Sequence, residues 1–348
     1  MGRSAFPVVF DGHNDVLLRL GAPDGGGPGA FFERGDRGHL DLPRAREGGL
    51  GGGLFAVWIP SPKEQTPGHA PGALPPALDA AYALRRSMAA AATLFRIEDL
   101  SNGEFRIART AAELRRCLDE EAMAAVLHFE GADAIDTDLD ALHVLYRAGL
   151  RSLGLVWGRP NAFAEGVAVR FRRSPDTGPG LTEAGKRLVR ACNDLRVMVD
   201  LSHLNERGFW DVASITDAPL VATHSNAHAL CPSSRNLTDP QLDAIRDSDG
   251  MVGLNFAVNF LREDAARDAN TPIETMVRHV DYLVGRVGIE RVGFGSDFDG
   301  VLIPHEIGDA SGLPGLMSAL RDRGYDDRAL RKLAHENWLR VLQETWGE

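Results

Sequence analysis

Short runs of hydrophobic residues recur along this chain and alternate with longer stretches in which hydrophobic residues are spaced three or four apart. The short runs predict β-strands, at about residues 7–10, 54–59, 124–129, 150–157, 196–201, 219–223, 251–256 and 291–295. The longer stretches predict helices, at about residues 78–95, 110–118, 139–148, 181–193, 273–287 and 327–345. Strands that alternate with helices in this way form a parallel sheet.

Eight strands of this kind close into a (β/α)8 barrel, so we expect an α/β protein with a somewhat distorted barrel. No change in composition marks a domain boundary, which predicts a single domain over residues 1–348. A doubly wound open sheet is the alternative, and it would place a glycine-rich phosphate-binding turn directly after a strand. The glycine-rich run at residues 48–53 precedes an expected strand instead, which favours the barrel.

Composition excludes several classes of function. The chain has 44% hydrophobic and 25% charged residues, as globular proteins do. Its net charge of −11 argues against nucleic acid or an anionic membrane surface as a partner. No run could span a bilayer, and the first strand begins too early to leave room for a signal peptide. We therefore expect a cytoplasmic protein without a membrane anchor and, given three scattered cysteines, without disulfides.

Residues that can bind a metal follow five of the expected strands. They are His13, Asp15, Glu130, His203, His224, Asp297 and Asp299. The C-terminal ends of barrel strands surround one mouth, where the active site is built. An isolated His-x-Asp pair is more often an ordinary polar strand end. Three imidazoles and several carboxylates at one mouth instead predict a metal site, with ligands suited to zinc.

The number of ligands suits two metal ions if one ligand bridges them. The chain has only three lysines, Lys63, Lys186 and Lys332. They fall in a loop or in helices, so a carboxylated lysine is a poor candidate and Glu130 is the natural bridge. One ion would take His13, Asp15 and Glu130, and the other would take Glu130, His203 and His224. Two ions about 3.5–4 Å apart can hold a hydroxide between them at neutral pH.

The remaining histidines do not share this pattern. His128 lies on the same strand face as Glu130 and is expected to line the barrel. His39 and His228 flank the mouth without an assigned role. The others fall in loops or helices and are expected to be surface or structural residues: His69, His143, His279, His305 and His335.

Several of these segments resemble motifs of the membrane dipeptidase (renal dipeptidase-like, peptidase M19) family of zinc enzymes. Residues 11–15 (DGHND) resemble the family's first metal motif, and residues 129–131 (FEG) resemble its bridging-glutamate segment. Residues 200–203 (DLSH) and 223–226 (THSN) resemble its two histidine motifs. The resemblance runs from about residue 10 to the C-terminal helix.

Two more segments of the resemblance concern substrate and catalysis. Residues 234–236 (SRN) resemble the segment whose arginine holds the substrate carboxylate, and residues 293–300 (GFGSDFDG) resemble the segment with the catalytic aspartate. The resemblance implies a dipeptidase with two zinc ions, often a homodimer, that cleaves L,L- or L,D-dipeptides with a hydroxide held between the metals. Asp297 would then move the proton, Arg235 would bind the terminal carboxylate, and Asp299 would be structural.

One position departs from the family pattern. Family members typically carry a histidine that stabilises the oxyanion at the end of the fourth strand, where this chain has Trp157. Trp157 could donate the hydrogen bond itself, Arg159 or Asn161 could replace it, or the substrate could differ. We therefore consider Trp157 and Asn161 as substrate-binding residues. Two alternatives remain: a related two-metal amidohydrolase acting on a lactam or an N-acyl amino acid, and a non-catalytic metal-binding or scaffold protein.

Overall fold

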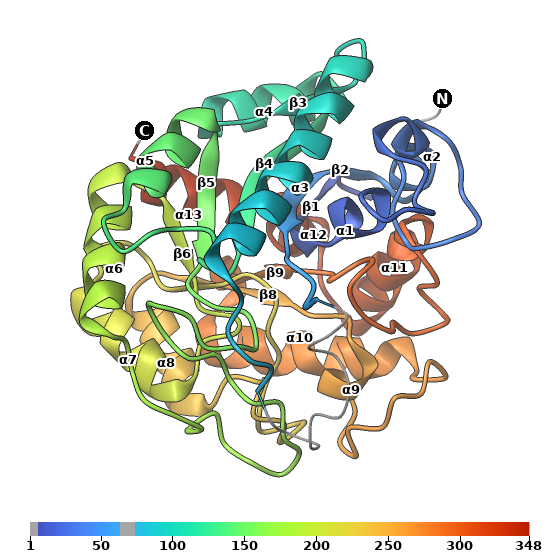
Figure 1. Cartoon of the computed structure of the whole chain (residues 1–348). Helices are drawn as coiled ribbons and strands as arrows, with labels where there is room; N and C mark the ends of the chain where they lie inside the picture. The colour runs from blue at the N-terminus through green and yellow to red at the C-terminus, as the bar shows by residue number, and fades with distance from the viewer. Residues whose placement is uncertain (1–5, 63–73, 348) are drawn as a thin grey trace.

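The strands form a closed parallel barrel, as predicted. The computed structural model describes residues 6–62 and 74–347, so the expectations for the first residues, Lys63 and His69 lie outside the described residues. Its nine strands follow the order β2-β1-β9-β8-β7-β6-β5-β4-β3, and a further β2–β4 pairing closes the ring. Because β3 extends the sheet beyond β4, the other eight strands make the barrel (Figure 1).

The observed strands confirm the predicted ones, with shifted ends. They are β1 (Val9–Asn14), β2 (Leu50–Val57), β3 (Phe105–Ile107), β4 (Met123–Glu130), β5 (Leu150–Gly154), β6 (Met198–Asp200), β7 (Val221–Ala222), β8 (Met251–Leu254) and β9 (Val292–Phe294). β3 was not predicted, because three residues are too few for a recognisable alternation. Since β5 ends at Gly154, Trp157 lies in the loop after the strand.

The placement of the glycine-rich run was wrong in one respect. We expected it to precede the second strand, but residues 51–53 lie inside β2. β2 pairs with both β1 and β4, so side chains at these positions have little room. A Cβ on Gly52 would come within 2.5 Å of the Ala124 carbonyl oxygen, and one on Gly51 within 2.4 Å of Val8. The glycines therefore allow the strands to approach closely, rather than marking a loop.

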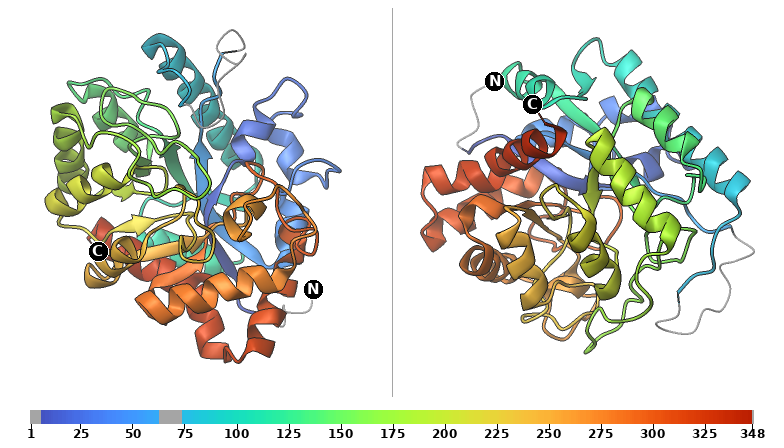
Figure 2. Two further views of the ribbon diagram at one scale, coloured as in Figure 1. Left: turned by 90° about the horizontal axis from the view of Figure 1, so that it is seen from below. Right: turned by 90° about the vertical axis from the view of Figure 1, so that its left-hand side faces the viewer.

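Helices surround the barrel on its outside (Figure 2). The predicted ones are α3 (Ala80–Leu100), α4 (Ala111–Asp119), α5 (Asp140–Ala148), α6 (Glu183–Leu195), α10 (Ile273–Val287), and the C-terminal series α12 (Asp327–Arg331), η5 (Lys332–Glu336, a π-helix) and α13 (Asn337–Trp346). Those not predicted are α1 (Val16–Leu20), α2 (Leu42–Gly48), α7 (Glu206–Ile215), α8 (Asp239–Asp247), α9 (Val258–Leu261), α11 (Leu313–Arg323), and the 3-10 turns η1 (Pro28–Phe32), η3 (Ile289–Arg291) and η4 (Ala310–Gly312).

The described residues contain neither a membrane-spanning helix nor a disulfide. No helix described here combines the length and the apolar character that a membrane crossing needs. Cys117, Cys192 and Cys231 are all buried free thiols, as the expectation of no disulfides requires.

The C-terminal helix fills part of the barrel interior with one indole. Trp338 of α13 is completely buried, and its Nε1 donates a hydrogen bond to the Phe294 carbonyl oxygen at 3.0 Å. Three strands face it with glycines, and a Cβ on Gly12, Gly293 or Gly253 would lie 2.3, 2.7 or 3.0 Å from its ring atoms. The sequence therefore leaves space on the strands for this one large side chain.

Replacing the indole should be costly. We expect Trp338→Ala to lower the free energy of unfolding by about 3–5 kcal/mol, because it leaves a cavity in a rigid barrel. Chemical denaturation measures this change. Trp210→Ala is the control, since Trp210 is 39% exposed on α7 and its loss should cost much less. Equal costs for the two variants would contradict this packing.

A buried histidine should make the fold sensitive to acid. His279 of α10 contacts the Leu261 carbonyl oxygen through Nε2 at 2.9 Å and accepts the Ala227 N–H at Nδ1, and burial lowers its pKa to about 4. Between pH 6.5 and about 4, His279 therefore carries a proton in the unfolded chain and not in the folded chain. Stability should fall by about 1.4 kcal/mol per pH unit as the pH drops through this range. His279→Gln should reduce that slope in denaturation curves; an unchanged slope would show that another group is responsible.

Candidate metal centre

The carboxyl ends of the strands bring the five predicted metal ligands to one place. His13 lies in β1 and Asp15 directly after it, as the residue that precedes α1. Glu130 is the last residue of β4, and His203 and His224 follow β6 and β7. All five have little exposed surface, so they meet inside the mouth rather than on its rim.

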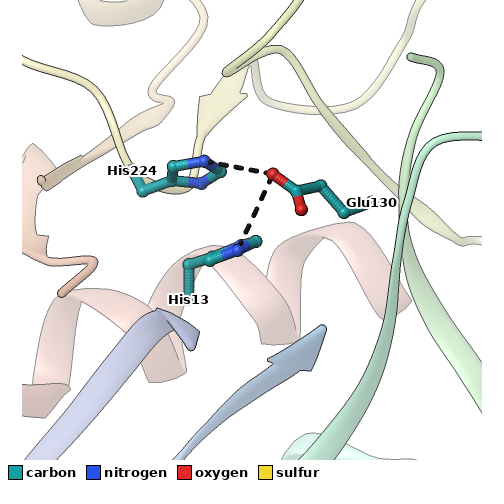
Figure 3. Close-up of side chains that lie close together, drawn as sticks. All are labelled: His13, Glu130 and His224. Atoms are coloured by element: carbon teal, nitrogen blue, oxygen red, sulfur yellow. Dashed lines mark ion pairs between the residues drawn. The ribbon is translucent and has the colours of Figure 1, made fainter. Parts of the chain in front are cut away.

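One carboxylate oxygen is the centre of this cluster. Glu130 Oε1 lies 2.8 Å from His203 Nε2, 3.6 Å from His224 Nε2 and 3.8 Å from His13 Nε2. In Figure 3 the His13 and His224 rings both approach the Glu130 carboxylate. The Nε2 atoms of His203 and His224 are 3.0 Å apart. Three imidazole nitrogens therefore surround one anionic oxygen.

Further carboxylate oxygens lie close to His13. Its Nε2 is 3.6 Å from Asp15 Oδ2. His13, Asp15 and Asp297 each offer a ligand atom within 4.8 Å of the others, and so do His13, Glu130 and His224. His128 and Asp200 form a third such group with His13. Overlapping ligand groups that share His13 are compatible with neighbouring cations, although Asp297 was expected to be catalytic rather than a ligand.

Unpaired buried atoms indicate that these residues fit metal ions. Within residues 6–62 and 74–347, both ring nitrogens of His13 and one oxygen of Asp15 are buried without a hydrogen-bond partner. Buried polar atoms in folded proteins almost always have a partner. Nitrogen and carboxylate ligands of this kind suit zinc and its neighbours in the first transition series.

The pKa shifts of the clustered residues also indicate that this site favours bound cations. Burial raises the pKa of Glu130 well above its usual value and raises the pKa of Asp297 to about 7, although His13 opposes both shifts. Burial alone would lower the pKa of His13, but Glu130, Asp15 and Asp297 outweigh it and raise that pKa to about 10. Several buried carboxylates thus share the positive charge of His13 and of Arg235, and divalent cations would balance them.

The other two histidines have the protonation state that metal binding requires. Burial lowers the pKa of His203 and of His224 well below the usual value, and the nearby positive charges of His13 and Arg235 add to the effect. Both rings are therefore neutral at pH 7. A neutral imidazole is the form that coordinates a metal.

Asp297 is held in a defined orientation beside the cluster. Its backbone N–H donates to the His13 carbonyl oxygen at 3.0 Å, and its φ of 60° lies in the left-handed region, which aspartate tolerates. Asn255 Nδ2 donates to its Oδ2 at 2.8 Å. No hydrogen bond to Oδ1 occurs within the described chain, so this oxygen remains available for chemistry.

Arg235 lies buried at the same mouth with donors to spare. Its guanidinium donates to Ser225 Oγ at 2.9 Å and to the His224 carbonyl oxygen at 3.1 Å. Burial lowers its pKa, against the opposing attraction of Asp297, Asp200 and Glu130. A guanidinium has five N–H donors, so further N–H groups remain for an anionic ligand.

Trp157 forms an aromatic wall next to His203. The two rings are 6.1 Å apart, and Trp58 meets Trp157 edge-on at 5.0 Å. The Arg159 guanidinium lies 5.0 Å from the Trp157 ring centre and donates to the Ile59 carbonyl oxygen at 2.9 Å. The Asn161 amide donates to one backbone carbonyl and accepts two backbone N–H groups in its own loop. Of these candidates, Trp157 is the one placed beside the metal ligands.

Several other predicted residues have structural contacts. Asp299 accepts from Arg19 Nε at 3.0 Å and from the His39 N–H, consistent with a structural role. His128 is fully buried with Nδ1 2.8 Å from Ser152 Oγ, so it lines the barrel as expected. Lys186 and Lys332 form surface ion pairs, with Glu183 and Glu290 respectively.

Sequence reasoning missed three residues that hold the site together: Asp200, Thr223 and Asn255. Each lies at or just after the end of a strand, as the predicted ligands do. The sequence prediction covered only metal ligands at these positions and not the hydrogen-bond partners of those ligands. The same positional rule, applied to all polar residues, would have identified these three.

A barrel with buried histidines and carboxylates at its mouth is typical of metal-dependent hydrolases. Comparisons with known proteins narrow this class. The sequence pattern of the membrane dipeptidase family (peptidase family M19) matches residues 4–346, and the chain belongs to this family.

Similar proteins support the same assignment. A metallopeptidase from Rhodobacter sphaeroides, whose crystal structure holds a phosphinate mimic of the dipeptide L-Ala-D-Ala, is 52% identical, with a TM-score of 0.95 over 98% of this chain and 100% of that one. The metallopeptidase dipeptidase AC, of family M19, is 53% identical, with a TM-score of 0.94 over 99% and 100%. An uncharacterized protein in the pqqA 5′ region of Klebsiella pneumoniae is 52% identical over 248 residues, 71% of this chain and 92% of that protein. The chain is therefore a metallodipeptidase-type hydrolase acting on peptide bonds, which excludes the scaffold alternative.

The fit of the cluster to metal ions can be tested through stability. Zinc added to metal-free protein should raise the thermal midpoint, because a ligand at 100 times its Kd stabilises the folded state by about 2.7 kcal/mol. His13→Ala should lose most of this shift, whereas His143→Ala, an exposed change on α5, should keep it. Scanning calorimetry with metal analysis measures both. Equal shifts in the two variants would place the zinc elsewhere.

Proposed function

We propose that this protein hydrolyses dipeptides with two zinc ions that share Glu130. The observation that carries the proposal is the approach of three imidazole nitrogens to the single oxygen Glu130 Oε1. His13 and Asp15 would complete the coordination of one ion, and His203 and His224 would complete the coordination of the other. Such ions, when bound, polarise a carbonyl oxygen and lower the pKa of water to about 7.

Arg235 would select substrates with a free carboxylate. Its spare N–H groups can form a bidentate pair with a carboxylate, and the hydrogen bonds to Ser225 and His224 hold the guanidinium in place. A carboxylate site so close to the metal ligands leaves room for one residue after the scissile bond. The mimic of L-Ala-D-Ala bound by the Rhodobacter sphaeroides relative supports this length and supports L,D-dipeptides as candidate substrates beside L,L-dipeptides.

Asp297 would move the proton during hydrolysis. Asn255 occupies its Oδ2, which leaves Oδ1 to take a proton from the attacking water and to pass it to the leaving amine nitrogen. Burial raises the pKa of Asp297 to about 7 in the metal-free protein. Bound cations nearby would lower this pKa, so the carboxylate would be ionised and able to accept the proton of the attacking water.

Trp157 would complete the substrate pocket. Trp58 and Arg159 hold its ring, and its indole N–H has no hydrogen-bond partner within the described residues. The N–H can therefore donate to the substrate carbonyl oxygen, where the family's histidine would act. Asn161 would support this pocket through its loop. Assembly as a homodimer and location in the cytoplasm stay predictions.

A release assay over a dipeptide panel, with zinc-loaded protein, tests the proposal. Arg235→Lys should raise KM about 10–100-fold, because it keeps the charge but loses the paired donors. Dipeptide amides should be poor substrates for the unchanged protein and should lose little more in the variant, since they lack the carboxylate that Arg235 binds. Arg246→Lys, on the surface of α8, is the control. Failure to cleave any dipeptide would favour the lactam or N-acyl amino acid alternative.

The indole has its own test. Trp157→Phe keeps an aromatic ring but removes the donor, so kcat should fall about 10²–10³-fold with a small change in KM. The thermal midpoint shows whether the variant stays folded. If Trp157→His instead cleaves ordinary dipeptides much faster than the unchanged protein, the natural substrate is another amide.

A further inference from the structure

A buried carboxylate beneath the metal ligands collects four hydrogen bonds. Asp200, the last residue of β6, accepts at Oδ1 from the Ser202 N–H at 3.0 Å, the Ser202 hydroxyl at 2.6 Å and the Thr223 N–H at 2.9 Å. Its Oδ2 accepts from the Thr223 hydroxyl at 2.7 Å. Four donors suit an ionised carboxylate, which can only accept.

The Thr223 hydroxyl also contacts the ring of the next residue. Its Oγ1 lies 2.8 Å from His224 Nδ1. A hydroxyl has one proton, and among the neighbours of Oγ1 the Asp200 carboxylate can only accept, at 2.7 Å, whereas Ser202 Oγ lies farther away, at 3.2 Å. We therefore assign the hydroxyl proton to the hydrogen bond with Asp200 Oδ2. Oγ1 can therefore only accept from His224, so the ring proton must reside on Nδ1.

The hydrogen bond from His224 Nδ1 to Thr223 Oγ1 determines which ring nitrogen of His224 has the free lone pair. A neutral imidazole with its proton on Nδ1 has a free lone pair on Nε2. Nε2 of His224 is the atom that lies 3.6 Å from Glu130 Oε1 and 3.0 Å from His203 Nε2. A metal ion binds only the nitrogen that lacks a proton.

We propose that Asp200 and Thr223 are positioning residues that fix the His224 proton on Nδ1, so that Nε2 is ready to bind a metal before the metal arrives. The inference rests on the proposed metal centre. His128 also approaches this carboxylate, but its Nε2 is 3.7 Å from Asp200 Oδ2, beyond a hydrogen bond. Ser202 Oγ accepts the backbone N–H of His224 at 3.1 Å, whereas the Thr223 hydroxyl is the group that connects Asp200 to the His224 ring.

Asp200→Asn should reverse the donors and acceptors in the series of hydrogen bonds from residue 200 through Thr223 to His224, because an amide has nearly the same shape as a carboxylate but can donate. The amide oxygen remains where two backbone N–H groups donate, so the amide nitrogen replaces Oδ2 and donates to Thr223 Oγ1. The hydroxyl then has two acceptors within reach, His224 Nδ1 at 2.8 Å and Ser202 Oγ at 3.2 Å. The shorter contact favours donation to Nδ1, which moves the ring proton to Nε2. We expect nitrogen NMR of the metal-free, histidine-labelled protein to show this change of tautomer, and zinc affinity to fall by about 10–100-fold or more.

Variants at Thr223 and Ser202 separate this role from packing. Thr223→Ser keeps the hydroxyl and should keep both the Nδ1 proton and the zinc affinity. Thr223→Val removes the acceptor and should weaken binding less than Asp200→Asn, because it leaves the tautomer free instead of forcing the wrong one. Ser202→Ala removes a donor from the same carboxylate and should leave the tautomer unchanged.

The outcomes are distinguishable. An Asp200→Asn protein that keeps its proton on Nδ1 and binds zinc normally overturns the proposal, and so do equal losses in Asp200→Asn and Ser202→Ala. If Thr223→Val does not fold, the isosteric Asp200→Asn and the conservative Thr223→Ser still decide. If the tautomer responds as expected but the unchanged protein binds no zinc, the hydrogen-bond chain stands and the proposed function fails.

Discussion

The structure depends on one buried carboxylate, Glu130, and on the imidazoles that surround it. An anion at the bottom of a closed mouth, away from water, is costly unless positive charge compensates it. Among the described residues, the positive charges that act on Glu130 are those of His13 and of the guanidinium groups of Arg235 and Arg159. The neutral rings of His203 and His224 contribute lone pairs but no positive charge. Cations are therefore needed to balance the negative charge of the buried carboxylates. Metal binding and folding of the mouth are therefore linked.

The packing beneath the site brings the strand ends close enough for this cluster to form. The Thr223 carbonyl oxygen points into the barrel, where a Cβ on Gly12, Gly253 or Gly295 would lie 2.5, 1.9 or 1.9 Å away. Gly12 also faces Trp338, whereas the next residue, His13, enters the metal cluster. Two adjacent residues of β1 thus have different roles: Gly12 allows close packing, and His13 contributes to the metal cluster. Glycine at these positions is a requirement of the site as much as of the barrel.

Much of the fold and of the candidate site could be predicted because both follow from strand ends. The apolar runs identified all eight barrel strands, and the polar residues after them gave the cluster around Glu130. The short strand β3 and the glycines inside β2 were missed, because pairing partners and close approach are not visible in local hydrophobicity. Asp200 and Thr223 were missed for a related reason. They act through a hydrogen bond between the ends of two strands, and this contact is visible only once the strands are placed side by side.

The most direct test of the central claim is anomalous scattering at the zinc edge, on crystals of protein grown with zinc and never exposed to chelator. Two peaks about 3.5–4 Å apart, with a Glu130 oxygen between them, would agree with the account. The His13, His203 and His224 rings should then point toward the peaks. Crystals that show no peak within coordinating distance of these residues would contradict it.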